Sequence, residues 1–237
     1  MSISTVSVIE CETRQEASEK VSIFIAQKLA DEISQTGASN LLVSGGSTPK
    51  AMFQHLSKSD VDWSAVTVGL VDERCVPASH DSSNARLALE NLLVHAAREA
   101  TFVPMYRDGE TPACIAASAN SDYAALVSKS IVVLGMGSDA HTASWFPGAV
   151  NLGNAFDRGA PNVVAIDADG CEVAGEVTDR LTLTRQAISK CKNAVLMLFG
   201  DDKKVVFQQA LTKKVEDAPI RAAVDDLGER LITVWAP

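Results

Sequence analysis

Short runs of nearly continuous apolar residues recur along the chain, and longer segments with apolar residues three or four positions apart separate them. The runs are rich in β-branched side chains and contain few polar residues. This pattern is typical of strands that are covered on both faces. Strands are therefore expected at residues 40–44, 66–72, 130–136, 162–167, 194–200 and 231–235.

The segments between these runs carry the helical period. Thr13 followed by Glu16 forms a capping box, and a helix is expected from there to about Gly37. Its apolar face comprises Ala17, Val21, Phe24, Ile25, Leu29 and Ile33. Further helices are expected at residues 49–57, 84–98, 112–128, 185–192 and 203–212.

Strands and helices thus alternate almost throughout the chain, which predicts an α/β fold with a mostly parallel sheet and helices on both faces. No internal repeat or linker rich in Pro, Gly or Ser divides the sequence, so residues 1–237 are expected to form a single domain. Residues 148–161 form the longest irregular stretch and are interpreted as a loop beside the site. In open α/β sheets ligands bind outside the carboxyl ends of the strands, and candidate chemistry is sought there.

Composition supports a globular protein with a sizeable core. The 237 residues are 46% hydrophobic and 22% charged. A formal net charge of −9 argues against a general surface for nucleic acid or anionic membrane, because both require a basic face. No apolar run approaches the roughly 18 residues of a membrane span, and the amino terminus lacks a signal-peptide pattern, so a cytoplasmic protein is expected.

The five cysteines are odd in number and widely spaced, and none forms a C-x-x-C pair. Neither a disulfide framework nor a zinc site is therefore expected. They are interpreted as reduced and mostly buried thiols: Cys11, Cys75, Cys114, Cys171 and Cys191.

The stretch LLVSGGSTPK (41–50) joins the first buried strand to a helix. Gly45 and Gly46 allow a ligand to approach backbone N–H groups, and Ser47 or Thr48 can cap a helix whose first residue is Pro49. Such a helix start suits an anion such as phosphate, although an ordinary strand-to-helix turn explains the sequence as well. It matches neither the P-loop nor the dinucleotide fingerprint, so ATP and NAD are not supported.

Charged residues end the next strand, at Asp72, Glu73 and Arg74. An arginine there can pair with phosphate or carboxylate, while the neighbouring acids hold it or bind sugar hydroxyls. A solvated loop is the alternative. Ser83 or Asn84 follows in a position that caps the helix at 84–98, and capping alone explains both.

The segment LGMGSDAHTASWFPG (134–148) is the most specific of these strand ends. Asp139 and His141 stand two residues apart in a loop after two glycines. Histidine exchanges protons near neutral pH, and a nearby carboxylate fixes its tautomer, so His141 is a candidate general base. The other histidines, His55, His80 and His95, are interpreted as structural.

Two later cations complete the candidates. Arg180 opens the run RLTLT, and Lys203 follows Asp201 and Asp202, either of which can cap a helix start. Both cations can be ordinary surface charges. If they face the first glycine turn, they form a phosphate clamp with its backbone donors.

Six stretches in this order, SGGSTP, VDERCVP, SSNARL, LGMGSDAHTASWFPG, RLTLT and GDDK, resemble 6-phosphogluconolactonase, which shares a superfamily with glucosamine-6-phosphate deaminase. The resemblance covers about residues 40–210. It implies a Rossmann-like three-layer αβα domain, no metal or organic cofactor, and hydrolysis of the lactone of 6-phosphogluconate in the oxidative pentose phosphate pathway. The expected partner is a small sugar-phosphate lactone, with no nucleic acid and no membrane, and the chain is expected to be a monomer or a weak homo-oligomer.

The resemblance also implies roles for single residues. Lys203 and Arg180 hold the phosphate, while Arg74 and Asp72 contact the sugar acid or order the site. His141 is the catalytic base, with Asp139 beside it. The phosphate or sugar end of the site is formed by Gly45, Gly46, Ser47 and Thr48.

One position departs from the family pattern G-x-D-G-H-T, because Ala140 replaces the glycine between Asp139 and His141. If that position requires a positive φ, alanine costs about 1 kcal/mol and reshapes the loop slightly. The activity is expected to remain.

Two alternative functions stay open. The sibling deaminase has a loop resembling N-E-P-G, whose glutamate assists opening of the sugar ring, whereas this chain has Phe146 before Pro147 and no carboxylate. DERCVP likewise resembles the lactonase rather than the DEY motif of the deaminase. A non-catalytic sugar-phosphate sensor is the other alternative, and a base placed in the loop argues against it.

Overall fold

The structure is a computed structural model that describes residues 8–237. Residues 1–7, which open the stretch expected to lack a signal peptide, lie outside the described part. The strands are β1 (Val8–Glu10), β2 (Ser39–Val43), β3 (Val66–Leu70), β4 (Asp72–Arg74), β5 (Thr101–Phe102), β6 (Ser130–Leu134), β7 (Val163–Asp167), β8 (Asp179–Leu183), β9 (Asn193–Phe199) and β10 (Leu231–Ala236).

The α-helices are α1 (Arg14–Thr36), α2 (Lys50–Leu56), α3 (Asn84–Asn91), α4 (Pro112–Tyr123), α5 (Leu152–Phe156), α6 (Arg185–Ser189), α7 (Asp201–Ala210) and α8 (Ile220–Leu227). Short 3-10 helices cover Trp63–Ala65, His95–Glu99 and Gly228–Arg230.

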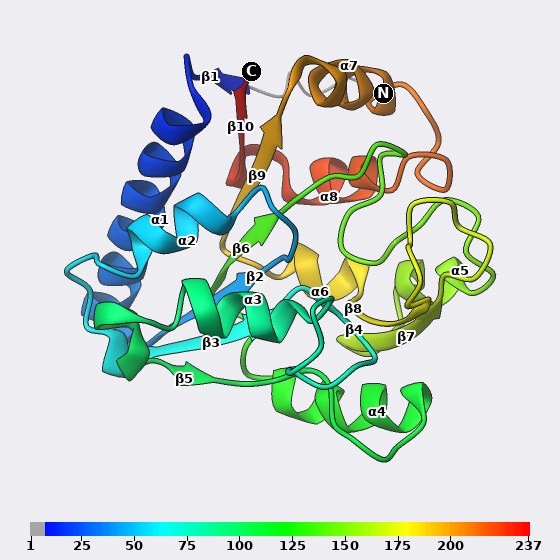
Figure 1. The fold of residues 1–237 in the computed structure, drawn as a ribbon, viewed down its shortest axis with the longest axis horizontal. Helices are drawn as coiled ribbons and strands as arrows, with labels where there is room; N and C mark the ends of the chain where they lie inside the picture. The colour runs from blue at the N-terminus through cyan, green and yellow to red at the C-terminus, as the bar shows by residue number, and fades with distance from the viewer. Residues whose placement is uncertain (1–7) are drawn as a thin grey trace.

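Seven strands form a main sheet in the order β1-β10-β9-β6-β2-β3-β5, and neighbouring strands in it are parallel (Figure 1). The strands β4, β8 and β7 form a second, antiparallel sheet. The expected α/β fold with a mostly parallel sheet is therefore confirmed. The chain order reverses between β2 and β6, and this switch point is where open α/β sheets place their ligands.

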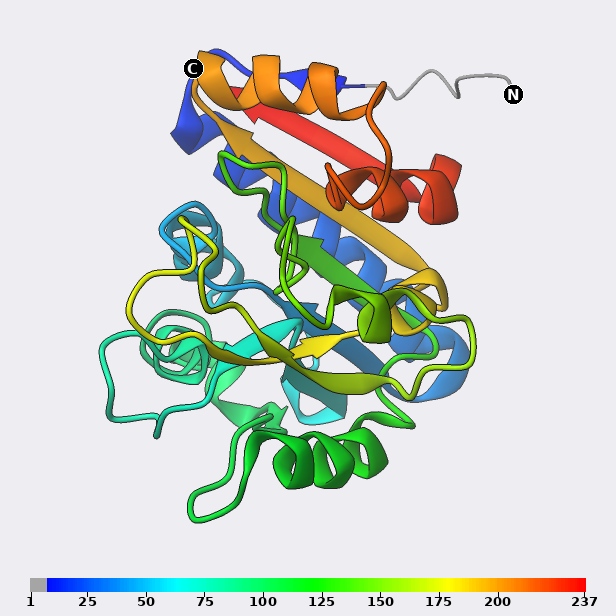
Figure 2. The same ribbon diagram turned by 90° about the vertical axis from the view of Figure 1, so that its right-hand side faces the viewer.

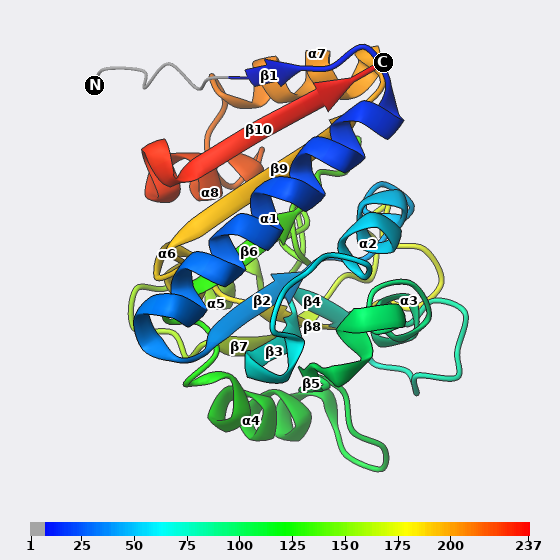
Figure 3. The ribbon, with the colours of Figure 1, turned by 90° about the vertical axis from the view of Figure 1, so that its left-hand side faces the viewer.

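Helices cover both faces of the main sheet. α1 runs across one face, over β10, β9 and β2, and α2 packs beside it (Figure 3). The opposite face carries α7 and α8, together with α6 and the second sheet (Figure 2). The second sheet is covered in turn by α4 and α5, which contact β7.

α1 forms where the sequence predicts it. The Thr13 side chain accepts a hydrogen bond from the Glu16 N–H at 3.1 Å, and Gly37 ends the helix with a φ of 81°. Ala17, Val21 and Leu29 are buried against the sheet. A capping box, a left-handed glycine and an apolar stripe thus act together.

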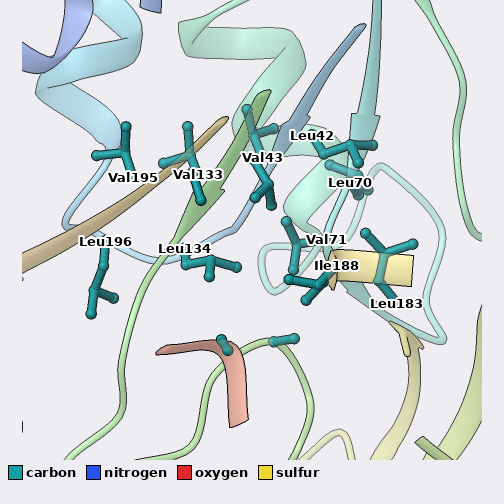
Figure 4. Close-up of a cluster of buried hydrophobic side chains, with 14 of the residues drawn as sticks. Leu42, Val43, Leu70, Val71, Val133, Leu134, Leu183, Ile188, Val195 and Leu196 are labelled. Carbon is teal, nitrogen blue, oxygen red and sulfur yellow. The ribbon is translucent and has the colours of Figure 1, made fainter. Parts of the chain in front are cut away.

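One part of the core lies where the central strands meet the second sheet. Val71 joins the two sheets, because its N–H donates to the Val43 carbonyl at 2.9 Å and its own carbonyl accepts from the Leu183 N–H at 2.8 Å. Figure 4 shows the buried side chains that gather there: Leu42, Val43, Leu70, Val71, Val133, Leu134, Leu183, Ile188, Val195 and Leu196. This packing fixes the strand ends that lead into the site.

Several elements differ from the expectations. The run at 162–167 is β7 of the second sheet rather than a strand of the main one, and the strand expected at 66–72 divides into β3 and β4. The helix expected at 84–98 ends at Asn91, and a 3-10 turn follows. β1, β5, β8, α5 and α8 were not expected.

The cysteines are all free thiols, but the expectation that most of them are buried is wrong, because only two of the five are. Cys11 and Cys191 are buried, Cys75 and Cys171 are half-buried, and Cys114 is exposed. Within residues 8–237, no helix combines the length and the apolar character needed to cross a membrane.

Candidate active site

A cavity of about 280 Å³ opens at the carboxyl ends of the central strands. Its walls come from residues 44–48 after β2, Asp72 and Arg74 in β4, Asn84 in α3, residues 135–137, His141 and Ala143 after β6, and Lys203 in α7. Segments far apart in the sequence therefore meet at the switch point between β2 and β6.

The glycine turn after β2 presents free backbone donors to this cavity. Among the described residues, no backbone acceptor pairs with the N–H groups of residues 45–48. Gly46 has a φ of 91°, and a Cβ at Gly45 would lie 1.8 Å from Asn84 Oδ1, so both positions require glycine. Consecutive free N–H groups before a helix are a suitable site for an anion.

The expected cap of α2 is absent. Pro49 precedes the helix rather than being its first residue, and no side chain of the turn accepts a capping hydrogen bond. Ser47 and Thr48 instead line the cavity.

The loop after β6 holds the histidine and its carboxylate together. His141 Nδ1 lies 2.6 Å from Asp139 Oδ1, and the His141 backbone N–H donates to the same oxygen at 3.1 Å. Burial opposes ionisation of Asp139, but the hydrogen bond and the charge of His141 outweigh it, so the pKa of Asp139 lies below its ordinary value. The pair fixes the tautomer with Nδ1 protonated and leaves Nε2 as the basic nitrogen.

Gly137 makes room for this pair. A Cβ there would lie 2.1 Å from His141 Nδ1 and 2.5 Å from Asp139 Oδ1. The imidazole therefore lies directly on the Gly137 backbone, whose N–H donates to the His141 carbonyl at 2.9 Å. Any larger residue at 137 would displace the histidine.

Ala140 adopts the left-handed conformation that the family glycine would favour, with a φ of 65°. Its carbonyl accepts a hydrogen bond from the Ile220 N–H at 3.0 Å, which ties the loop to the first residue of α8. Ala143, on the other side of His141, has a φ of 52°. The histidine is thus flanked by two alanines in a conformation that L-residues rarely adopt.

Phe146 separates His141 from Arg180. Its ring centroid is 4.5 Å from that of the imidazole, and the Arg180 guanidinium lies 5.8 Å from it. Arg180 is only 2% exposed and donates from Nη2 to the Ala174 carbonyl, while Nε and Nη1 have no partner among the described groups. Arg180 therefore does not line the cavity, and only Lys203 of the two cations expected at the glycine turn does so.

Burial and neighbouring charges shift the pKa values of Arg180 and Lys203. Burial lowers the pKa of Arg180 to about 10, and the positive charge of Arg74 acts in the same direction. Arg74 lies opposite Arg180 in the pairing of β4 with β8. Burial lowers the pKa of Lys203, and Asp139 acts in the opposite direction. Lys203 Nζ donates to the Met136 carbonyl at 3.0 Å, so the amine lies beside the His141 loop. No side chain caps α7, contrary to the expectation for Asp201 and Asp202, and Gly200 precedes it with a φ of 94°.

β4 supplies the acidic and basic wall. Asp72 Oδ2 accepts a hydrogen bond from Ser144 Oγ at 2.7 Å, and the Arg74 guanidinium donates from Nη1 to the Ser82 carbonyl. Both residues line the cavity. The solvated loop that was the alternative for residues 72–74 is excluded, because Asp72 is only 9% exposed.

Glu73 is fully buried and joins β4 to the start of α3. Its carboxylate accepts from the backbone N–H groups of Arg74, Asn84 and Ala85 at 2.7, 2.8 and 2.7 Å, and from Ser83 Oγ at 3.0 Å. Burial raises the pKa of Glu73, while these hydrogen bonds act against the rise.

Ser44 and Asn84 line the cavity, although the sequence indicates only a turn for Ser44 and a helix cap for Asn84. Ser83 is the true cap of α3, since its side chain accepts from the Arg86 N–H at 3.2 Å. The sequence signal for Asn84 is its place directly after the capping Ser83, because the Asn84 side chain is then not needed as the helix cap. Across residues 8–237, no group of three or more His, Cys, Asp or Glu side chains is arranged to hold a metal ion.

Known proteins resemble this chain over nearly its whole length. A family model described as glucosamine-6-phosphate isomerases/6-phosphogluconolactonase matches residues 12–233. A 6-phosphogluconolactonase of Rhizobium meliloti (strain 1021) is 45% identical over 90% of this chain and 91% of its own length. One from Xylella fastidiosa (strain Temecula1) is 41% identical over 87% of this chain and 86% of its own length.

Solved structures agree with these sequence matches. The crystal structure of a 6-phosphogluconolactonase from Shewanella baltica OS155 superposes with a TM-score of 0.93 at 34% identity, covering 99% of each chain. The chain therefore belongs to the family of glucosamine-6-phosphate isomerases and 6-phosphogluconolactonases.

Proposed function

We propose that this chain is a 6-phosphogluconolactonase, which hydrolyses 6-phospho-D-glucono-1,5-lactone to 6-phospho-D-gluconate in the oxidative pentose phosphate pathway. The observation that carries the proposal is the His141–Asp139 pair, at 2.6 Å, on the wall of a cavity whose other walls hold free N–H groups and Lys203. Close relatives over nearly the full chain bear the same name.

His141 acts as the general base. With Nδ1–H held by Asp139, Nε2 takes a proton from water as the water oxygen bonds to the lactone carbon C1. The tetrahedral intermediate then collapses, the bond from C1 to the ring oxygen breaks, and the imidazolium returns its proton to that oxygen. One histidine thus serves both halves of the reaction. Because a lactone is already a reactive ester, a positioned base suffices, and the proposal includes no metal or organic cofactor.

The phosphate binds where the donors gather. The N–H groups of residues 45–48 and the Lys203 ammonium hold its oxygens, and the Arg74 guanidinium contacts the sugar acid or the developing oxyanion. Arg180 reaches the phosphate when its side chain turns away from the Ala174 carbonyl and past Phe146. Its Nε and Nη1, which have no partner among the described groups, then donate to the phosphate oxygens. Asp72, fixed by Ser144, accepts from sugar hydroxyls.

Phe146 favours the lactonase over the deaminase of the same superfamily. Ring opening of an amino sugar uses a carboxylate in this loop, and the ring of Phe146 instead lies against His141. The chain is further proposed to act as one catalytic domain in the cytoplasm, as a monomer or a weak homo-oligomer. Its net charge of −9 supports a small-molecule partner rather than nucleic acid.

The decisive assay offers fresh 6-phosphogluconolactone and glucosamine 6-phosphate in parallel and records the release of acid and of ammonia. Acid release well above spontaneous lactone hydrolysis, without ammonia, is the expected result. Ammonia without acid would reassign the chain to the deaminase. Binding without turnover of either compound would make it a sensor.

A further inference from the structure

Asn84 occupies the boundary between the glycine turn and the acidic wall of the cavity. It is the first residue of α3, its side chain lines the cavity, and only 4% of the residue is exposed. Ser83 already caps α3, so the Asn84 carboxamide is not needed for that purpose. A buried amide beside a ligand cavity requires another explanation.

Contacts with β4 and with the glycine turn fix the position of Asn84 and the orientation of its carboxamide. The Asn84 backbone N–H donates to Glu73 Oε1 at 2.8 Å, and Nδ2 donates to the Asp72 carbonyl at 2.8 Å. Oδ1 lies against Gly45, where a Cβ would be 1.8 Å away. Since Nδ2 is committed to the β4 backbone, the amide cannot flip without losing that bond, and Oδ1 is left on the side of the glycine turn.

Oδ1 is the free polar atom of this arrangement. Within residues 8–237, the hydrogen bonds of the Asn84 side chain all run from Nδ2 to Asp72. A carboxamide oxygen only accepts hydrogen bonds, so an ionised phosphate, which also only accepts, cannot be its partner. A sugar hydroxyl, which can donate, can.

We propose that Asn84 is a substrate-binding residue that accepts a hydrogen bond from a ring hydroxyl of the lactone. The cavity then has two chemically distinct parts. The N–H groups of residues 45–48 and Lys203 donate to phosphate, whereas Asn84 Oδ1 and the Asp72 carboxylate accept from hydroxyls. Glu73 sets the position of Asn84 through the start of α3. This inference rests on the proposed lactonase function.

The test is a double-mutant cycle between residue 84 and the substrate hydroxyls. Wild type and Asn84→Ala are assayed with the parent lactone and with analogues that each lack one ring hydroxyl. The matched control is Asn91→Ala on the same helix, since Asn91 is 6% exposed and does not line the cavity; its Nδ2 donates to the Leu87 carbonyl at 3.0 Å and its Oδ1 accepts from Gln54 Nε2 at 3.3 Å. Asn84→Ser is measured in parallel in case the alanine variant does not fold. Serine suits the first turn of a helix, but its side chain is too short to reach the ring hydroxyl.

We expect Asn84→Ala to lose about 3- to 10-fold in kcat/KM, the effect of one neutral hydrogen bond, while Asn91→Ala matches wild type. One deoxy analogue should show the same loss with wild type and no further loss with the variant. Because the contact is with the sugar, the loss should persist on unphosphorylated glucono-1,5-lactone.

Additive losses with every analogue, or a loss restricted to the phosphorylated lactone, would overturn the assignment. Absence of turnover by wild type would instead refute the proposed function. The same cycle is therefore also measured on the binding of 6-phosphogluconate and its deoxy analogues by calorimetry, which tests Asn84 without requiring turnover.

Discussion

Ala140→Gly measures the strain in the loop that carries His141. Ala140 has a φ of 65° and is only 3% exposed, so its methyl group is both buried and attached to a left-handed backbone. Relief of that conformation is worth about 1 to 2 kcal/mol. Loss of the buried methyl costs about 0.8 kcal/mol, and the greater freedom of glycine in the unfolded chain costs about 0.4 to 1 kcal/mol. The terms nearly cancel, and the free energy of unfolding should change by less than about 1 kcal/mol.

Ala168 provides the matched control. It is fully buried, lies outside helices and strands, and is not among the residues with positive φ. Ala168→Gly carries both costs without the relief and should destabilise by about 1 to 2 kcal/mol. Urea unfolding of the two variants gives the difference directly, and kcat/KM of Ala140→Gly should stay near wild type because the His141–Asp139 pair is unchanged. Equal destabilisation of the two variants would refute the claim that Ala140 is strained.

Three further predictions concern the walls of the cavity. Lys203→Ala should raise KM about 10- to 100-fold, as expected for the loss of a hydrogen bond from a charged group, and this effect should vanish on an unphosphorylated lactone. The control is Lys204→Ala, because the Lys204 amine donates to Glu10 instead. An equally large effect of Lys203→Ala on the unphosphorylated lactone would contradict a phosphate contact. Glu73→Gln should lower the free energy of unfolding by about 1 to 3 kcal/mol, because its NH2 group then faces at least one of the backbone N–H groups that donate to the carboxylate. KM should rise with it, and an unchanged urea midpoint would show that the carboxylate does not hold α3. The pKa of Asp139 in the folded protein is below its ordinary value, so its ionised form stabilises the fold at pH values above the unfolded pKa, and this stability is lost as pH falls through the native pKa. The urea midpoints of wild type and Asp139→Asn should therefore converge in acid. Midpoints that stay equally far apart at every pH would contradict the pairing with His141.

Local chemistry made much of the fold predictable. The capping box at Thr13 and the glycine at Gly37 bound α1 to within a residue, because both ends are specified by neighbours in sequence. Central strands such as β6 were found because strands buried on both faces leave long apolar runs. The second sheet was not recognised, because an apolar run such as 162–167 does not record which sheet it joins. Its pairing depends on β8, a strand distant in sequence.

The candidate site was predictable where its residues follow directly after parallel strands. The strand-end rule predicts that His141 and the glycine turn meet at one edge of the sheet, and both line the cavity, since parallel strands bring their carboxyl ends together there. Asp139 lies beside them through its contact with His141. The position of Arg180 outside the cavity wall could not be predicted, because its burial beside Phe146 depends on a side-chain orientation that no local pattern encodes. The place of Asn84 in the cavity wall could not be predicted, because its link to Glu73 joins β4 to the start of α3, whose proximity only the fold creates.

His141 is proposed to be the base of a lactone hydrolase. The most direct test follows the disappearance of fresh 6-phosphogluconolactone by NMR with wild type, His141→Ala and the control His55→Ala, whose partly exposed imidazole lies outside the cavity. We expect His141→Ala to lose about 10² to 10⁴ in kcat while binding 6-phosphogluconate as tightly as wild type, and His55→Ala to retain full activity. Turnover by His141→Ala close to that of wild type would contradict the account.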